Sequence, residues 1–338
     1  MSFRLDSHAC AAAVAAALAA VLAAFQTARA EAPFAAAPGA QRPKPRVRAR
    51  ILADADAVRA GRDFLLGVLL QIEPTWHVYW KNPGDAGLAT EVRFALPKGF
   101  SAQPLNWPIP VRFDQPGDIV GYGYEKAVLL WARVTPPKKL PPHPAIVLAA
   151  DVSWLACGDI CVPGEAKLKL ELPVAGADNK GVGGSADTFA RWRARLPAPA
   201  ASADRRVTAT VGGKLPRGPD AGSFRITLDW KGPVPNKIQW FPGPIGGVEI
   251  AKAAIRTNGR QTRVSFSARV LAGGKLSAKV LESLVVYTGA DGARRAVRVP
   301  VQLVGRRGGK QPTKPKTDAK DGESDKPSTE PITRKKKD

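Results

Sequence analysis

Two cysteines close together are the residues of this chain with the most evident chemistry. Cys157 and Cys161 are separated by three residues, and the only other cysteine, Cys10, lies in an N-terminal segment that we expect to be removed. Two thiols at this spacing can form a disulfide across a tight turn, or they can exchange electrons with the thiols of another protein. Gly158 supports a tight turn because glycine permits backbone conformations that other residues avoid.

The loop between the cysteines is short, and this weakens a purely structural role. The stabilisation that a disulfide provides grows with the length of the loop it closes. A domain of ordinary size also has enough hydrophobic core to fold without one. A redox-active pair and a structural cross-link both stay open at this point, and these arguments favour the redox-active pair.

The residues around the pair carry negative charge and no positive charge. No Lys, Arg or His occurs in residues 152–166, and Asp151, Asp159 and Glu165 are the ionisable neighbours of the thiols. Nearby carboxylates disfavour a thiolate, and cations or a helix N-terminus would favour it. We therefore expect a pair that reacts when a partner docks, rather than a strong oxidant.

A metal site is a weaker interpretation of the same residues. Zinc is held by four Cys or His ligands in most structural sites. Beyond the N-terminal segment the chain offers only Cys157, Cys161, His77 and His143. His143 lies in a proline-rich loop, and His77 lies among aromatic residues, which is typical of a packed side chain. We expect no metal and no bound cofactor.

The N-terminus is typical of an export signal. Arg4 precedes an apolar run at residues 11–25, and Ala28-Arg29-Ala30 matches a cleavage motif. The run is shorter than the roughly 20 residues that span a bilayer. We expect cleavage after Ala30 and a soluble protein in the periplasm, an oxidising compartment.

The formal net charge of +22 would suggest nucleic acid in a cytosolic protein. Export argues against that partner, so we expect none. The densest basic runs, at residues 42–50 and 334–337, lie in proline-rich or terminal segments. We interpret them as solvated tails that can make weak contact with an anionic envelope surface.

The hydrophobic pattern predicts an all-β protein. Short segments with period-two alternation and Gly/Pro turns favour a β-sandwich over residues 49–176 and a second β-sandwich-like domain over 205–304. The predicted strands are 50–53, 63–72, 76–80, 91–96, 128–134, 145–155 and 167–172, then 206–210, 224–230, 237–241, 263–270, 284–288 and 295–304. The strand at 63–72 is apolar enough to be buried on both faces.

The remaining segments are predicted to be connections and tails. We expect a signal peptide at residues 1–30, a linker at 31–48, a linker with one short helix at 177–204, and a disordered basic tail at 305–338. The helix covers 186–196, with Ser185 as N-cap. Its Phe189, Trp192 and Leu196 share one face.

Four motifs follow one another along the first predicted domain. They are Trp-His-Val-Tyr-Trp-Lys-Asn-Pro-Gly-Asp-Ala-Gly at 76–87, Trp-Pro-Ile-Pro at 107–110, Gly-Tyr-Gly-Tyr at 121–124, and Cys157 to Cys161 with Val-Pro after it. Together they resemble the N-terminal periplasmic domain of the DsbD/ScsB family of thiol:disulfide interchange proteins. The resemblance covers about residues 48–175, and its most specific parts are the cysteine turn followed by Val-Pro and the Tyr-Trp-Lys-Asn-Pro-Gly-Asp-Ala-Gly run.

The resemblance implies an immunoglobulin-like β-sandwich whose cysteine pair takes electrons from a membrane-embedded partner. It then passes them to periplasmic thioredoxin-like proteins by thiol–disulfide exchange. Cys157 and Cys161 would be the redox couple, and the residues do not say which one attacks. The family shields the pair with an aromatic cap loop. Its nearest match here offers Tyr122 or Tyr124 and lacks the family's phenylalanine.

Two departures from the family shape the expectation. The spacing of the cysteines is shorter than in the best-known enteric member. Full-length members continue into a membrane domain and a thioredoxin-like domain, whereas this sequence continues into a second β region and a basic tail. We therefore expect a separate membrane protein to supply the electrons. The alternative is a non-enzymatic envelope binding or assembly protein with a structural disulfide.

Overall fold

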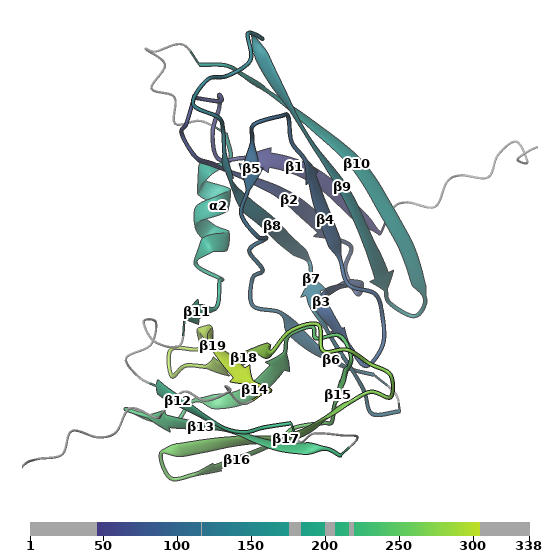
Figure 1. Cartoon of the computed structure of the whole chain (residues 1–338), viewed down its shortest axis with the longest axis vertical. Coiled ribbons are helices and arrows are strands. Elements are labelled where there is room, and N and C mark those ends of the chain that lie inside the picture. The colour runs from purple at the N-terminus through teal and green to yellow at the C-terminus, as the bar shows by residue number, and fades with distance from the viewer. Residues whose placement is uncertain (1–45, 116, 176–183, 200–206, 216–219, 305–338) are drawn as a thin grey trace, which may run out of the picture. The chain divides into compact units, whose positions relative to one another are not determined.

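The chain folds almost entirely into β-strands, as its hydrophobic pattern predicts (Figure 1). The computed structural model describes residues 46–115, 117–175, 184–199, 207–215 and 220–304. The predicted signal peptide, most of the N-terminal linker and the basic tail lie outside these residues. Within them there is one helix, and the rest of the regular structure is strand. The all-β class is confirmed.

The first β region is a sandwich of two antiparallel sheets. One sheet has the strand order β1-β2-β8-β5, and the other has β10-β9-β3-β7-β6 with β4 paired to β9. The strands are β1 (Val47–Ala53), β2 (Phe64–Ile72), β3 (His77–Gly84), β4 (Glu91–Ala95), β5 (Ser101–Ala102), β6 (Val111–Gln115), β7 (Ile119–Glu125), β8 (Ala127–Thr135), β9 (Ala145–Cys157) and β10 (Cys161–Pro173).

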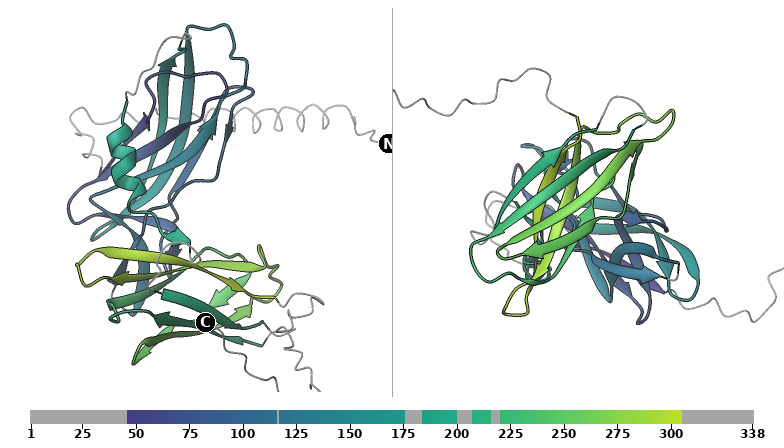
Figure 2. Two further views of the ribbon diagram at one scale, coloured as in Figure 1. Left: turned by 90° about the vertical axis from the view of Figure 1, so that its left-hand side faces the viewer. Right: turned by 90° about the horizontal axis from the view of Figure 1, so that it is seen from below.

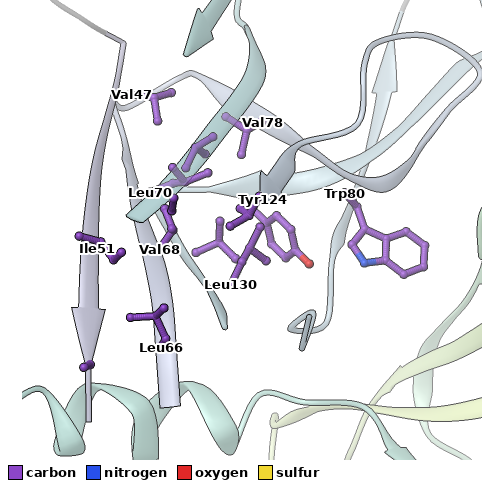
Figure 3. Packing of buried hydrophobic residues seen from close by; sticks show 14 of the residues in the cluster. Val47, Ile51, Leu66, Val68, Leu70, Val78, Trp80, Tyr124 and Leu130 are labelled. Atoms are coloured by element: carbon purple, nitrogen blue, oxygen red, sulfur yellow. The ribbon is translucent and has the colours of Figure 1, made fainter. Parts of the chain in front are cut away.

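The space between the two sheets is filled by aliphatic and aromatic side chains (Figure 3). Every second residue of a strand points to the same face, so the alternating apolar residues of facing strands meet there. The labelled side chains are Val47, Ile51, Leu66, Val68, Leu70, Val78, Trp80, Tyr124 and Leu130. β1 begins inside the segment predicted as linker, because Val47 is buried and pairs with Ile72.

β2 is buried on both faces, as predicted, because a helix covers its outer face. The helix is α2 (Ala186–Arg193), whose Phe189 packs on Leu65, Leu69 and Trp131 of the first sheet (Figure 2). Trp192 and Leu196 join the same cluster, which confirms the predicted apolar face. The predicted N-cap residue precedes the helix but makes no capping hydrogen bond with its side chain. The helix therefore belongs to the core of the first sandwich.

Gly-Tyr-Gly-Tyr, the nearest match to the family's cap loop, lies in a strand and not in a loop. This segment is the middle of β7, an inner strand of its sheet. A Cβ on Gly123 would lie 3.0 Å from the Phe113 ring and 2.0 Å from the Val78 carbonyl oxygen. The glycines leave room for the ring on one face of the strand, while the tyrosines point to the other face.

The second β region also consists of two sheets with their own core (Figure 2). Its sheets have the orders β11-β19-β18-β14 and β12-β13-β17-β15, with β16 paired to β17. The strands are β11 (Ala198–Pro199), β12 (Val207–Gly213), β13 (Gly222–Trp230), β14 (Asn236–Pro242), β15 (Val248–Ile250), β16 (Ala254–Asn258), β17 (Gln261–Val270), β18 (Val280–Thr288) and β19 (Arg294–Gln302).

Both sandwiches belong to one compact unit that begins at Arg46. Phe241 of β14 is fully buried, and its ring lies 6.5 Å from that of Trp80 and 5.0 Å from that of Tyr122. The Asn82 amide nitrogen donates a hydrogen bond of 2.7 Å to the carbonyl oxygen of Pro242. The domain boundaries set out above stay a prediction. Among the described residues, no helix has the length and apolar character needed to cross a membrane.

Candidate redox site

The two cysteines form a disulfide at the end of the β9–β10 hairpin. Cys157 and Cys161 are directly opposite each other in the antiparallel register, with their Cα atoms 4.2 Å apart. The Gly158 amide donates a 3.0 Å hydrogen bond to the carbonyl oxygen of Ile160 across the turn. Figure 1 shows the two strands side by side over their length. The predicted strand, three-residue turn and return strand are therefore present.

The two halves of the disulfide differ in their exposure to solvent. Cys157 is buried, at 2% exposure, whereas Cys161 is exposed. Two apolar neighbours of Cys161 also face solvent, Ile160 at 65% and Val162 at 38%. A second protein can therefore reach Cys161 more readily than Cys157.

A tryptophan packs against the cysteine turn, next to its glycine. A Cβ on Gly158 would lie 3.3 Å from the Trp76 ring. Gly158 is absent from the residues with positive φ. The tight turn is present without a left-handed conformation at Gly158, and Trp76 leaves little room for a side chain there. The guanidinium of Arg46 also contacts this tryptophan and lies over its ring, 4.9 Å from the ring centre.

The structure places a histidine beside the buried cysteine. β3 pairs with the end of β9, so His77 is directly opposite Cys157. On its other side β3 pairs with β7, so His77 is also directly opposite Glu125. Directly paired residues of antiparallel strands point to the same face, with Cβ atoms about 4.5–5.5 Å apart. Cys157, His77 and Glu125 thus form one row across three strands.

The sequence does not reveal this row. His77 lies far from the cysteines along the chain, and its aromatic neighbours favour a packed side chain. The packing is present: the imidazole stacks on Phe113 with the centroids 4.2 Å apart, and meets Tyr79 edge-on at 5.2 Å. The strand register, which only long-range pairing defines, is what brings the histidine to the cysteine.

The imidazole of His77 is partly removed from solvent. Its Nε2 is buried and has no hydrogen-bond partner among the described residues. Burial lowers the pKa of His77, and the negative charge of Glu125 opposes that effect. Because desolvation is the larger cause, the imidazole is mainly neutral near neutral pH.

The Asn-Pro-Gly-Asp-Ala-Gly run covers Tyr79 on the same face of the sheet. Gly87 has a φ of 102°, and a Cβ there would lie 2.3 Å from the Tyr79 ring. The Thr90 hydroxyl donates a 2.8 Å hydrogen bond to the Tyr79 carbonyl oxygen. Only glycine fits this conformation and this contact. The motif therefore holds the Tyr79 ring in place beside His77.

The two tyrosines that the resemblance offers as a shield point elsewhere. Tyr124 pairs with Val78, one position from the row of Cys157, and its side chain lies in the core (Figure 3). Its hydroxyl donates a 2.8 Å hydrogen bond to the Pro108 carbonyl oxygen, and burial raises its pKa well above the ordinary value. Tyr122 shares that face of β7 and contacts Phe241. A shielding role for either tyrosine stays a prediction; the contacts bring Trp76 to the cysteine turn instead.

No metal site accompanies the disulfide in the part of the chain that the structure describes. Nowhere in it do three His, Cys, Asp or Glu side chains gather as the ligands of one ion would. The chemistry available at this site is that of the two sulfurs and of the side chains that pack around them.

The comparison with protein families agrees with these features. Residues 48–173 match the family described as "Thiol:disulfide interchange protein DsbD, N-terminal". The matched part of the chain holds both cysteines and nearly all of the strands of the first sandwich, and it is similar to that family. A comparison with curated proteins finds no match.

Among solved structures, the chain is similar to the N-terminal periplasmic domain of ScsB from Proteus mirabilis. The identity is 20%, the TM-score is 0.55, and the match covers 78% of this chain and 96% of that one. Because 78% of the chain is more than the first sandwich contains, the match includes the second β region. The fold of that region is therefore also similar to part of the ScsB domain. A protein of unknown function from Porphyromonas gingivalis W83 matches at 10% identity over 77% of this chain and 100% of its own, with a TM-score of 0.21, too low to bear on the fold.

Proposed function

We propose that this protein is a periplasmic thiol–disulfide exchange protein. It would relay electrons between a separate membrane partner and thioredoxin-like proteins through Cys157 and Cys161. The observation that carries the proposal is the unequal exposure of the two cysteines, of which Cys157 is buried and Cys161 is exposed. A cross-link that only held the hairpin together would gain nothing from this difference. An exchange reaction depends on access to the sulfur that is attacked, and the exposed Cys161 provides that access.

The exposure assigns a role to each cysteine in the proposed reaction. A thiolate of the reduced donor attacks the sulfur of Cys161, forms an intermolecular disulfide, and expels Cys157 with the bonding electron pair. The donor's second thiolate then attacks its own sulfur in the mixed disulfide and releases Cys161. Two electrons have passed to the pair, and the donor leaves as a disulfide.

The second half of the relay runs in the opposite direction. The thiolate of Cys161 attacks the disulfide of a thioredoxin-like acceptor and forms a mixed disulfide. Cys157 then attacks Cys161, restores the internal disulfide and releases the reduced acceptor. The exposed apolar side chains of Ile160 and Val162 beside Cys161 would contact the partner during both steps. The similarity of the first sandwich to the DsbD N-terminal family supports partners of the thioredoxin-like class.

Trapping of mixed disulfides tests the proposal. Cys157→Ala leaves Cys161 able to attack but unable to be resolved, so we expect stable adducts with thioredoxin-fold proteins of the envelope. Cys161→Ala leaves only the buried thiol, so we expect few adducts. The variants control each other because each retains one thiol. Adducts from neither variant would overturn the proposal.

A measured reduction potential separates the proposal from the alternative of a binding protein with a structural disulfide. Structural disulfides of secreted proteins have potentials below about −300 mV, which resist reduction by thiol pools. We expect a higher value for the pair. A value well below that limit would favour the alternative.

A further inference from the structure

The row of Cys157, His77 and Glu125 carries a further inference about how the buried sulfur reacts. A buried thiol stays protonated and is a poor nucleophile, and a buried thiolate is a costly leaving group. The sequence offers no Lys, Arg or His within residues 152–166 to relieve this. The fold supplies a basic group from another strand, since His77 is directly opposite Cys157.

We propose that His77 is the acid–base partner of Cys157 in disulfide exchange, and that Glu125 is a positioning residue for the imidazole. The inference rests on the proposed exchange function and adds the route of the proton. When Cys157 leaves as a thiolate, His77 takes up a proton from solvent and passes it to the sulfur of Cys157. When Cys157 must attack, neutral His77 accepts the proton of its thiol, and the resulting thiolate forms the bond to Cys161 as the partner's thiolate departs.

The unpaired nitrogen of His77 supports this role. Its Nε2 is buried without a hydrogen-bond partner among the described residues. A buried polar atom without a hydrogen-bond partner requires an explanation, and a redox or catalytic role is one possible explanation. In the oxidised protein, Cys157 has no proton to donate, because its sulfur is bonded to Cys161. Reduction creates an S–H group on the residue directly opposite the histidine. The Cys157 thiol would therefore be a hydrogen-bond donor for His77 that exists only in the reduced protein.

The groups around the imidazole keep it available as a base. The titratable groups that face it are Glu125 of β7, Cys157 of β9 and Tyr79 of its own strand, while Phe113 of β6 adds an uncharged ring. Burial lowers the pKa of His77 from its ordinary 6.5, so at neutral pH the ring can accept a proton. Glu125 opposes this shift and would stabilise the imidazolium once the proton has arrived.

A two-step reaction with a coloured product isolates the role of His77. The fully reduced mature protein, which begins after Ala30 and so lacks Cys10, is mixed with dithiobis-nitrobenzoate, an aromatic disulfide that releases a coloured thiol. Cys161 attacks first and releases one equivalent; Cys157 then attacks Cys161 and releases the second. We expect His77→Gln and His77→Phe to slow the second release by about 10²-fold or more at pH 7, the usual range for acid–base assistance. The first release should keep its rate.

The pH profile is the readout that a purely structural role would not change. In the unmodified protein we expect the rate of the second release to rise through a step below pH 6.5 and then level off. In the His77 variants it should keep rising until the thiol itself ionises. Glu125→Gln should move the step to lower pH, because the charge that raises the pKa of His77 is gone. His143→Gln, at an exposed histidine outside the site, is the matched control and should change neither release.

The outcomes separate this inference from the proposed function. If the His77 variants release the second equivalent as fast as the unmodified protein, the acid–base role is wrong and the exchange function stands. If the unmodified protein itself never releases a second equivalent, the exchange function fails. If both variants fold poorly, the pH profile of the unmodified protein decides: a rate that rises without a step below pH 6.5 overturns the role of His77.

Discussion

The chain contains two long antiparallel hairpins whose turns are closed in different ways. In the first sandwich, β9 and β10 are each 13 residues long, and the Cys157–Cys161 disulfide closes their turn. In the second, β18 and β19 are each 9 residues long, and an ion pair between Asp291 and Arg295 closes the turn. In both hairpins the joined residues are four positions apart. The second hairpin therefore closes its turn without a covalent bond.

The comparison teaches that a hairpin of this fold has other sources of stability than its turn. β9 and β10 are held by a continuous register from the cysteines to the pair of Ala145 and Pro173. Trp154 packs over Gly164 on the opposite strand, and Leu148 lies in the core. Chain-entropy arguments give a disulfide across so short a loop only about 2 kcal/mol. Chemistry explains its presence better than stability does.

The largest expected effect comes from removing both sulfurs. Cys157→Ala/Cys161→Ala should abolish transfer of electrons to a thioredoxin-like acceptor, because no other cysteine remains in the described chain. The free energy of unfolding should fall by about 2 kcal/mol, the entropic contribution of the short loop. Urea unfolding, with and without reductant for the unmodified protein, measures this second quantity.

The reduced unmodified protein is the matched control, because it keeps both side chains and lacks only the bond. It should unfold close to the double variant. A loss of 4–5 kcal/mol or more, at the upper end for structural disulfides, would contradict the comparison. It would show that the first hairpin depends on its covalent closure.

The sequence predicts well those elements in which local pattern and tertiary burial agree. β13 alternates Phe224, Ile226 and Leu228 into its core, and its pattern alone predicts it. The α2 helix presents Phe189 to the sheet as its spacing predicts. In each case the side chains that define the pattern are also the ones that the fold buries.

The prediction fails where a residue is chosen for a distant neighbour. β7 contains glycines that are typical of turns, yet Gly123 is needed because Phe113 and the Val78 carbonyl crowd it. The pairing of His77 with Cys157 depends on the register of β3 against β9, which no local pattern encodes. The unequal exposure of the cysteines is likewise a property of the assembled sheet.

Substitutions at Gly158 and Gly164 test how much packing contributes to the stability of the first hairpin. A Cβ on Gly164 would lie 2.5 Å from the Trp154 indole nitrogen, whereas one on Gly158 would lie 3.3 Å from the Trp76 ring. Gly164→Ala must displace the indole, so we expect a loss of about 1–3 kcal/mol of unfolding free energy, as for other overpacked sites. Gly158→Ala should cost less, because a shift of a few tenths of an ångström relieves its contact.

Urea unfolding of both variants under oxidising conditions measures the difference. The disulfide is intact in each, so any loss reports the packing of the hairpin and not its covalent closure. Equal losses would mean that Trp154 moves freely away from Gly164. The hairpin would then have less support outside its turn than the comparison requires.

The smallest effect is expected at the second turn. Asp291 accepts a hydrogen bond of 2.8 Å from the Arg295 guanidinium, which holds the pKa of the carboxyl well below its ordinary 3.8. A carboxyl whose pKa is lowered by folding stabilises the protein above its ordinary pKa and loses that contribution as the pH falls toward the lowered value. Asp291→Asn should therefore lower the melting temperature slightly at pH 7 and low salt, and the difference should vanish in 1 M salt and well below pH 3.8.

Asp159, in the turn of the first hairpin, provides the matched control for that measurement. It is exposed, as Asp291 is, and it makes no ion pair with any residue that the structure describes. Asp159→Asn should thus change the melting temperature at neither salt concentration. A large, salt-independent loss in Asp291→Asn would reverse the argument, because the second hairpin would then depend on its turn as strongly as a covalent closure implies. The disulfide of the first hairpin could in that case be explained by stability alone.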